Sequence, residues 1–411
     1  MSNYYRFGWI ASLVVICSSA AQIAGIAAAE MDATAAQILP EQATVEVASA
    51  VPVVRQNELI EPEFVGALTP FESGRNDSNP VWSPVGELLA FERSRGDKRE
   101  IVVSHADGKP VQTIYFQLSG NEKDSKATQF FLPGLAEDPS YNSGVSWARD
   151  SKRFVFMSNG GEGNYDLYSQ LLGGAAQRLT EHKEKDGLAD WSPTSNQVVF
   201  VSGRSGKGDI YLLDPETRAV TQLTWGDKPY LYPRWSPDGK KIAMIYGSTE
   251  NHDIFVIDDL HKPVQSMRAL TSWDYDDLRP TWSPDGKKIA FYTNYNAAGE
   301  QKKWSLVVIA ADGSDGINGK QLEGQVVASD VMPDIEQGPA WLGDGSGLVY
   351  VKDDEREYNP IYIVDVASKK SKQLKTDTKM NHDIACGPQG LIAFRAQLDQ
   401  WDQIFIAKLK K

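Results

Sequence analysis

The sequence predicts an all-β fold, a seven-bladed β-propeller of four-stranded blades, closed by an N-terminal strand that completes the last blade. Three observations lead to this prediction. One motif recurs along the 411 residues, the segments after each copy alternate apolar and polar residues, and the last copy stops one strand short. A repeat of about 40 to 45 residues is typical of a propeller blade with four strands.

The recurring motif begins with tryptophan and reads W-S-P-D-G-K-K-I-A in its two clearest copies, at Trp235 and Trp282. The other copies are looser and begin at Trp82, Trp147, Trp191, Trp341 and, without a tryptophan, Cys386. Four of the six intervals between these positions are 44 to 47 residues long. Pro-Asp-Gly predicts a tight turn, because proline fixes φ and glycine accepts a left-handed backbone. We therefore expect each motif to start in an innermost strand, with its tryptophan packed between blades.

Strands are expected wherever the hydrophobic period is two residues. In the fourth unit they are expected at 232–236, 241–246, 253–257 and 265–271, and in the third at 197–202, 209–214 and 220–224. The seventh unit offers only 382–386, 391–395 and 403–408 before the chain ends. Residues 64–69 match the pattern of an outer strand, so they are expected to complete the seventh blade. This latch would leave no open sheet edge for aggregation.

The motif at Trp282, together with the segments D-I-F-V-I-D, D-I-Y-L-L-D and Q-L-T in neighbouring units, resembles the repeats of TolB-type propellers over residues 64–408. Such repeats occur in periplasmic TolB, beside serine peptidases and in oligogalacturonate lyases, so the resemblance implies a fold and leaves function open. TolB itself has an α/β domain before a six-bladed propeller, whereas residues 30–63 are too short for that domain. What the resemblance implies is an envelope propeller whose mouth docks another protein.

The N-terminus predicts export. Residues 1–29 contain Arg6, an apolar stretch and an A-x-A pattern ending at Ala29, as in a secretory signal peptide. An uncleaved membrane anchor is the alternative, because no charged residue lies between Phe7 and Ala29. Both interpretations place the protein in the periplasm or another extracytoplasmic space, and an anchor would also attach it to the membrane. Residues 30–63 are expected to be a linker or extended arm, and 64–411 the propeller.

Charge limits the class of partner. The net charge of −13 argues against binding to nucleic acid, which requires a basic surface. Two cysteines, Cys17 and Cys386, leave one after signal removal, so no internal disulfide is expected. Two insertions into the repeats are expected, at 117–143 and 311–337.

A binding surface is expected where loops precede the innermost strands and follow the second strands, at what we call the upper face. Acidic residues in the first set of loops are Glu72, Asp77, Asp138, Asp186, Asp190, Asp227, Asp274, Asp276, Asp277, Asp330, Asp334, Asp377 and Asp383. Aromatic residues in the same region could anchor a partner. The residues predicted to bind a partner protein are Asp186, Asp227, Tyr230, Tyr232, Trp273, Asp274, Tyr275, Asp276, Asp277, Tyr358 and Trp401. Ordinary hydrophilic turns are the alternative explanation for these acids.

Catalysis is not expected, and no cofactor is predicted. The chain has no G-x-S-x-G nucleophile motif, which argues against a serine peptidase. It also lacks a C-x-x-C metal pair. The alternative is a metal-dependent polysaccharide lyase of the oligogalacturonate type, in which His182, His252 and His382 from three units would hold a divalent metal. The expected function is therefore a non-enzymatic envelope scaffold that binds a membrane or envelope protein.

Overall fold

A computed structural model of the chain describes residues 59–96, 98–114, 142–160, 164–248, 251–295, 303–315, 322–353 and 358–410. The predicted signal or anchor segment and nearly all of the predicted linker and of the insertion at 117–143 lie outside these ranges. Within them, no helix combines the length and apolar character that a membrane crossing needs.

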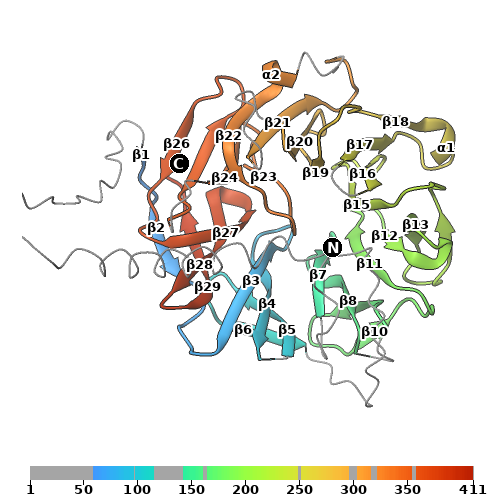
Figure 1. Cartoon of the computed structure of the whole chain (residues 1–411). Helices are drawn as coiled ribbons and strands as arrows, with labels where there is room; N and C mark the ends of the chain where they lie inside the picture. The colour runs from blue at the N-terminus through green and yellow to red at the C-terminus, as the bar shows by residue number, and fades with distance from the viewer. Residues whose placement is uncertain are drawn as a thin grey trace, which may run out of the picture. The chain divides into compact units, whose positions relative to one another are not determined.

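The described strands form five sheets of four strands and one sheet of nine, which follow one another along the chain (Figure 1). The first sheets contain β3 (Arg75–Trp82), β4 (Leu88–Arg95), β5 (Lys98–His105) and β6 (Pro110–Ile114), and then β7 (Asn142–Trp147), β8 (Arg153–Ser158), β9 (Asp166–Leu171) and β10 (Ala176–Arg178). The next contain β11 (Asp186–Trp191), β12 (Val198–Ser202), β13 (Asp209–Leu213) and β14 (Val220–Gln222), and then β15 (Tyr230–Trp235), β16 (Ile242–Ser248), β17 (Asn251–Ile257) and β18 (Met267–Ala269).

The nine-stranded sheet consists of two four-stranded groups and one added strand. The groups are β19 (Asp277–Trp282), β20 (Lys288–Thr293), β21 (Trp304–Ala310) and β22 (Val326–Met332), and β23 (Ala340–Trp341), β24 (Gly347–Lys352), β25 (Ile361–Asp365) and β26 (Ser371–Leu374). Pairing of Val331 with Lys352 and of Met332 with Val351 joins β22 to β24. The short strand β1 (Leu59–Ile60), inside the predicted linker, adds in parallel to β26.

The last sheet contains strands from both ends of the described chain. It consists of β27 (Lys379–Cys386), β28 (Leu391–Leu398), β29 (Trp401–Lys408) and, antiparallel to β29, β2 (Phe64–Ala67). Figure 1 shows β2 beside β29. The prediction of an all-β chain with four-stranded antiparallel units is therefore confirmed, and the architecture is propeller-like.

Two local predictions are corrected. Part of the outer strand expected at 265–271 is instead the short helix α1 (Pro263–Ser266), because Pro263 suits the first turn of a helix. The expected insertion at 311–337 contains the outer strand β22, whose register against β21 shifts twice, preceded by α2 (Leu322–Gln325). Short 3-10 turns lie at Gly203–Ser205 and Pro388–Gly390.

The motif tryptophans join neighbouring sheets by hydrogen bonds. Five of the six indole Nε1 groups donate to the backbone carbonyl of the residue that precedes the first motif residue of the neighbouring sheet. The pairs are Trp82 to Ala385 at 3.1 Å, Trp147 to Val81 at 3.2 Å, Trp235 to Asp190 at 3.1 Å, Trp282 to Arg234 at 3.1 Å and Trp341 to Thr281 at 3.3 Å. The Cys386 thiol occupies the same place, with Sγ 3.8 Å from the carbonyl oxygen of Ala340. The expectation that these residues pack between blades agrees with their contacts.

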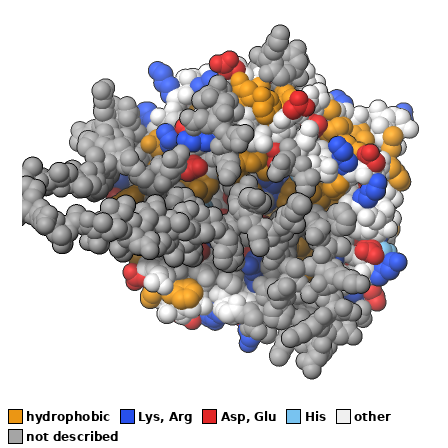
Figure 2. Space-filling model, viewed as in Figure 1, with side chains coloured by type: hydrophobic (Ala, Val, Ile, Leu, Met, Phe, Trp, Pro, Cys, Tyr) orange, Lys and Arg blue, Asp and Glu red, His pale blue; other side chains and the backbone are white. Residues whose placement is uncertain are grey.

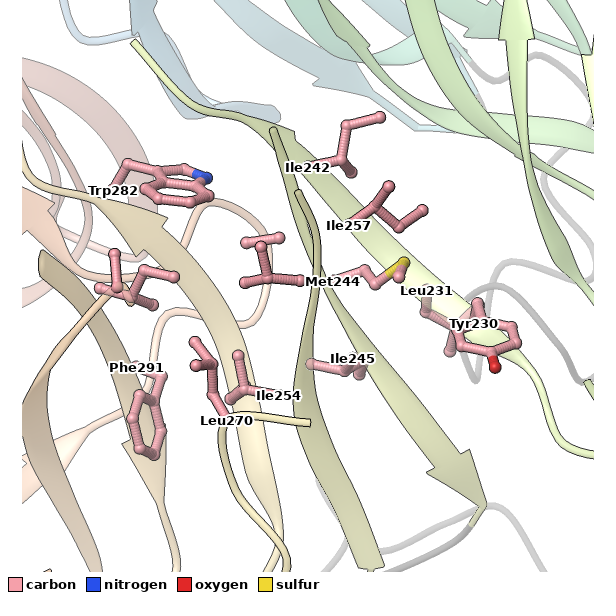
Figure 3. Close-up of a cluster of buried hydrophobic side chains, with 14 of the residues drawn as sticks. Tyr230, Leu231, Ile242, Met244, Ile245, Ile254, Ile257, Leu270, Trp282 and Phe291 are labelled. Atoms are coloured by element: carbon pink, nitrogen blue, oxygen red, sulfur yellow. The ribbon is translucent and has the colours of Figure 1, made fainter. Parts of the chain in front are cut away.

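The hydrophobic core lies between adjacent sheets. In Figure 3, Ile254 of β17 lies on the side of Trp282 and Phe291 of the next group, whereas Ile242 and Met244 of β16 point to the opposite side of their sheet. All but Trp282 are 0% exposed. Burial of a side chain of this size contributes about 1.5 to 3 kcal/mol, so these contacts are a major source of the stability that holds the sheets together.

The threonine of the Q-L-T pattern explains why that pattern marks outer strands. The Oγ1 atoms of Thr180, Thr224 and Thr271 accept backbone N–H groups from the third strands of their sheets, at Leu167, Ile210 and Ile254. Thr69 does the same beside β2, accepting the N–H of Ile404 at 3.2 Å. The N-terminal segment therefore makes the outer-strand contact of the last sheet.

We predict that Thr69→Val lowers the free energy of unfolding by about 1 to 3 kcal/mol, because the buried N–H of Ile404 loses its acceptor. Urea denaturation followed by tryptophan fluorescence measures the change. Thr69→Ser keeps the hydroxyl and serves as the matched control, with a midpoint near that of the wild type. Equal midpoints for Thr69→Val and the wild type would show that the latch does not stabilise the fold.

Candidate functional site

The first strands of the units share a strained position. The residue three positions before the first residue of each motif (a tryptophan or Cys386) has a positive φ. These residues are Asn79, Gly144, Leu188, Tyr232, Arg279, Gly338 and Asp383. Each of these residues except Gly338 lies in a break of the strand register, which marks a β-bulge. A left-handed backbone at a bulky residue costs about 1 to 3 kcal/mol. A bulge redirects side chains, so this position is the place to search for function.

Proline follows this position in four units, at Pro80, Pro233, Pro280 and Pro339. Proline has no N–H to donate to a neighbouring strand, and within sheets it is tolerated at bulges. The sequence thus favours an interrupted first strand, which turns the side chains before proline away from the regular pleat.

These redirected side chains meet residues of other strands in a charged group that we call the inner cluster: Tyr232, Arg279, Asp334, Glu336, Asp383 and Arg395. The guanidinium carbon of Arg279 lies 3.8 Å from the centre of the Tyr232 ring. Arg279 is only 4% exposed, and its Nε has no hydrogen-bond acceptor among the described residues. A buried cation on an aromatic face is stabilised electrostatically, yet Arg279 keeps unused donors.

The other arginine of the inner cluster, Arg395, has two carboxylates close to it, although its Nε, like that of Arg279, has no hydrogen-bond partner among the described residues. Arg395 Nε lies 2.9 Å from Asp383 Oδ2, and its Nη1 donates to Asp402 Oδ2 at 3.2 Å. Asp383 Oδ2 also accepts the backbone N–H of Asn79 at 3.2 Å, which connects β27 with β3. Burial, and then the charge of Arg395, lower the pKa of nearby His382 to about 4. His382 is therefore neutral at pH 7.

The pKa values of the Asp334 and Glu336 carboxyl groups are raised, whereas that of His382 is lowered. Burial, and then the charge of Asp383, raise the pKa of Asp334 to about 6. Burial also raises the pKa of Glu336 to about 7; the charge of Arg279 lowers this pKa, and the charges of Glu92, Asp334 and Asp383 raise it. Such shifts mark candidate functional groups in general.

A second feature lies at the upper end of the sheets, where first strands begin and second strands end. We call it the upper patch: Trp225, Asp227, Asp274, Tyr275, Asp276 and Tyr295. Trp225 is 59% exposed. Asp227, two residues later, and Asp274, in the loop before β19, are also exposed. The Tyr275 and Tyr295 rings meet edge to face, with centroids 5.1 Å apart.

Hydrogen bonds fix the acids of the upper patch. The Tyr246 hydroxyl donates to Asp227, which together with nearby lysines lowers the pKa of that carboxyl. Asp276 Oδ1 lies 2.6 Å from His252 Nδ1, and the N–H of Asp276 donates to Asn294 at 2.8 Å. Asp227 and Asp276 are thus held in position before any partner arrives.

The predicted binding residues separate into two sets. Asp186, Tyr230, Trp273 and Asp277 are buried, and as placed they cannot touch a partner. Asp186 instead accepts two hydrogen bonds from Arg204, and Tyr230 stacks 4.4 Å from the Tyr246 ring centre.

The remaining predicted residues are accessible to different degrees. Asp227 and Asp274 are exposed, Tyr275 and Asp276 are half-buried, and all four belong to the upper patch. Tyr358 is 45% exposed with Lys379 Nζ 5.1 Å from its ring centre. Half-buried Trp401 begins β29, and half-buried Tyr232 belongs to the inner cluster.

Sequence reasoning missed Arg279, Glu336 and Trp225. Arg279 could have been found by aligning the units, because it occupies the same motif position as Tyr232 and Asp383. No sequence signal indicated Glu336, whose neighbours come from three other sheets or groups. Figure 2 shows acidic, basic and hydrophobic side chains mixed over the described part of one face, without a continuous acidic field.

The three histidines of the lyase alternative have separate partners. His252 contacts Asp276, His182 Nδ1 accepts the N–H of Glu184 at 3.1 Å, and His382 lies beside Arg395. Across the described ranges, no three His, Cys, Asp or Glu side chains are grouped as metal ligands.

The repeated four-stranded sheets, the indole contacts between them and the threonine-closed outer strands define a propeller-like all-β protein. A family model described as "TolB beta propeller domain" (PD40) matches residues 134–333. The chain therefore carries TolB β-propeller repeats.

Two solved enzyme structures share this class of fold. An oligogalacturonate lyase from Vibrio parahaemolyticus is 14% identical, with a TM-score of 0.61 over 84% of this chain and 94% of that one. A puromycin-hydrolyzing peptidase of Mycobacterium tuberculosis is 13% identical, with a TM-score of 0.56 over 80% of this chain and 50% of that one. TolB from Acinetobacter baumannii is 19% identical, with a TM-score of 0.48 over 76% of this chain, which covers 66% of that chain. At these identities the likeness concerns the fold alone.

We predict that Tyr232→Leu lowers the free energy of unfolding by about 1 to 2 kcal/mol, because buried Arg279 loses the aromatic face beneath it. Tyr232→Phe keeps the ring and is expected to remain within about 0.5 kcal/mol of the wild type. Urea denaturation of the three proteins measures both changes. If Tyr232→Phe were as unstable as Tyr232→Leu, the phenol hydroxyl and not the ring would carry the interaction.

Proposed function

We propose that this protein is a non-enzymatic, extracytoplasmic propeller of seven blades, closed by β2, that binds a partner protein or peptide through the upper patch. The observation that carries the proposal is an exposed tryptophan, Trp225, two residues before Asp227, whose carboxylate is already held by a hydrogen bond from Tyr246. Exposed large aromatics at such sites are typical anchors of protein interfaces.

Support for closure comes from contacts between the first and last sheets. The Trp82 indole donates to Ala385, the Asp402 N–H donates to Asn76 Oδ1 at 2.9 Å, and β2 pairs with β29. These contacts unite the two ends of the described chain, as a closed circle of blades requires.

The acids of the upper patch give the proposed partner its chemistry. Asp227 is ionised at neutral pH because its pKa is lowered, and Asp274 lies in the next loop of the same end. A basic segment with an apolar residue fits this combination: the apolar residue would pack on Trp225, and the acids would favour association and orientation. The extracytoplasmic location rests on the signal-like sequence of residues 1–29.

The lyase alternative receives no support from the histidines, each of which has different partners. The similar structures include enzymes, and the activities in their names belong to those proteins. The proposal for this chain therefore rests on its own surface.

We predict that the tagged full-length protein, extracted from native membranes in mild detergent, retains a stoichiometric envelope protein. The double variant Trp225→Ala/Asp274→Ala is expected to weaken retention at least about tenfold, because anchor residues each contribute more than about 1 kcal/mol. Mass spectrometry quantifies the retained protein, and in the same run the mature N-terminal peptide shows whether residues 1–29 are removed.

Leu171→Ala is the matched control, because Leu171 is 51% exposed but lies at the opposite end of its sheet, between the third and outer strands. It should retain the partner as the wild type does. Equal retention by the double variant would remove the upper patch as the binding site. Recovery of the wild type alone would contradict the docking function.

A further inference from the structure

The loop between β22 and β23, residues 333–339, reaches an unexpected neighbour. We call it the bridging loop. Gln337 Nε2 donates to the carbonyl of Pro80 in β3 at 2.7 Å, and Thr281 Oγ1 of β19 donates to the carbonyl of Pro339 at 2.8 Å. The sheet of β27–β29 contacts the β23–β26 group through Cys386 and Ala340, and it contacts the β3–β6 sheet through Ala385 and Trp82. It therefore lies between the other two. The bridging loop therefore crosses past one whole sheet to touch a first strand beyond it.

The conformation of the bridging loop is locally fixed. Asp334 Oδ1 accepts the N–H groups of Glu336 and Gln337, both at 2.9 Å. Gly338 has φ of 89°, and a Cβ there would lie 2.8 Å from the carbonyl oxygen of Arg279. A side chain at this position would force the strand and the loop apart, so the loop sits tightly against β19.

The charges beneath the bridging loop are incompletely matched. Asp334 Oδ2 is buried without a hydrogen-bond partner, and so is Arg279 Nε. No ion pair involving Asp334, Glu336 or Arg279 occurs among the described residues, although all three share the inner cluster. A buried donor and a buried acceptor without partners are each costly, and the charge of Arg279 already acts on the Asp334 carboxyl group.

We propose that the bridging loop is a pH-sensitive closure over the inner cluster, seated when Asp334 and Glu336 are protonated and released when they ionise. The charged and titratable groups that act on Asp334 or Glu336 come from six strands: Asp383 of β27, Arg395 of β28, Glu92 of β4, Arg279 of β19, Tyr292 of β20 and Tyr232 of β15. Among the acids, Asp383 and Glu92 repel the ionised loop. His382 stays neutral above about pH 4 and does not act as the switch.

The direction of the effect follows from the pKa values. Those of Asp334 and Glu336 rise from 3.8 and 4.5 to about 6 and about 7 when the loop is seated. The seated state therefore holds protons that the released state gives up. Its stability is full below about pH 4 and falls as the pH rises through 6 and 7.

Hydrogen–deuterium exchange of peptides covering residues 333–340 in the full-length protein tests this closure. Labelling times at pH 5.5 and pH 8 are scaled to equal intrinsic exchange. After this scaling, we expect the wild-type loop to exchange at least about tenfold faster at pH 8, because more than one pKa unit separates its two states. Peptides of β16 should show no such change.

Three variants make the result specific. Asp334→Asn/Glu336→Gln keeps size and hydrogen-bonding oxygens but cannot ionise, so its loop exchange should be equal at both pH values. Gln337→Ala removes the bond to Pro80 and should speed exchange at both. Glu181→Gln, at a residue with a side chain 77% exposed, is the control and should behave as the wild type. Equal wild-type exchange at the two pH values, or a pH effect that persists in the double variant, would overturn the proposal.

Discussion

The hydrogen bond from a motif indole to a neighbouring backbone carbonyl is the interaction on which the rest of this architecture depends. Each unit has too few residues to bury its own hydrophobic surface, so stability comes from contact with the next sheet. The bond fixes the offset between two first strands at one point, and the core side chains then interdigitate at that offset. In the last unit Cys386 takes the place of the tryptophan. Its thiol is only a weak hydrogen-bond donor, yet its sulfur occupies the same position against the carbonyl of Ala340.

Each unit also contains, in or just before its first strand, one backbone position that departs from regular strand geometry. The residue three before the motif aromatic is left-handed whether it is Gly144, Leu188 or Arg279, so the backbone conformation is set by the repeat and not by the side chain. Evolution can therefore vary the residue at this position while its direction stays the same. In this chain the variation has placed an arginine, a tyrosine and an aspartate where they meet residues of the bridging loop.

The sequence predicted the repeated part of the fold well, because period-two strands and Pro-Asp-Gly turns are local signals. It even identified Thr69 as the end of an outer strand. Sites were harder to predict. Asp277 and Trp273 lie in a segment that reads as a loop, but the chain buries them where β19 begins. Glu336 gains its neighbours only through tertiary packing across several sheets, and no pattern along the chain encodes that meeting.

The pairing of β22 with β24 gives one part of the molecule a different mechanical character. Elsewhere, consecutive sheets are joined by side-chain contacts and by isolated backbone hydrogen bonds, such as those of Asp186 to Tyr165 and of Tyr230 to Gly208. Here, pairing at Val331 and Met332 makes β19–β26 one continuous hydrogen-bonded sheet, and the bridging loop lies within it, between β22 and β23. Under load or during partial unfolding, these two groups should therefore behave as a single cooperative element. The bridging loop starts and ends in that element, so its two ends should stay together even when neighbouring sheets separate.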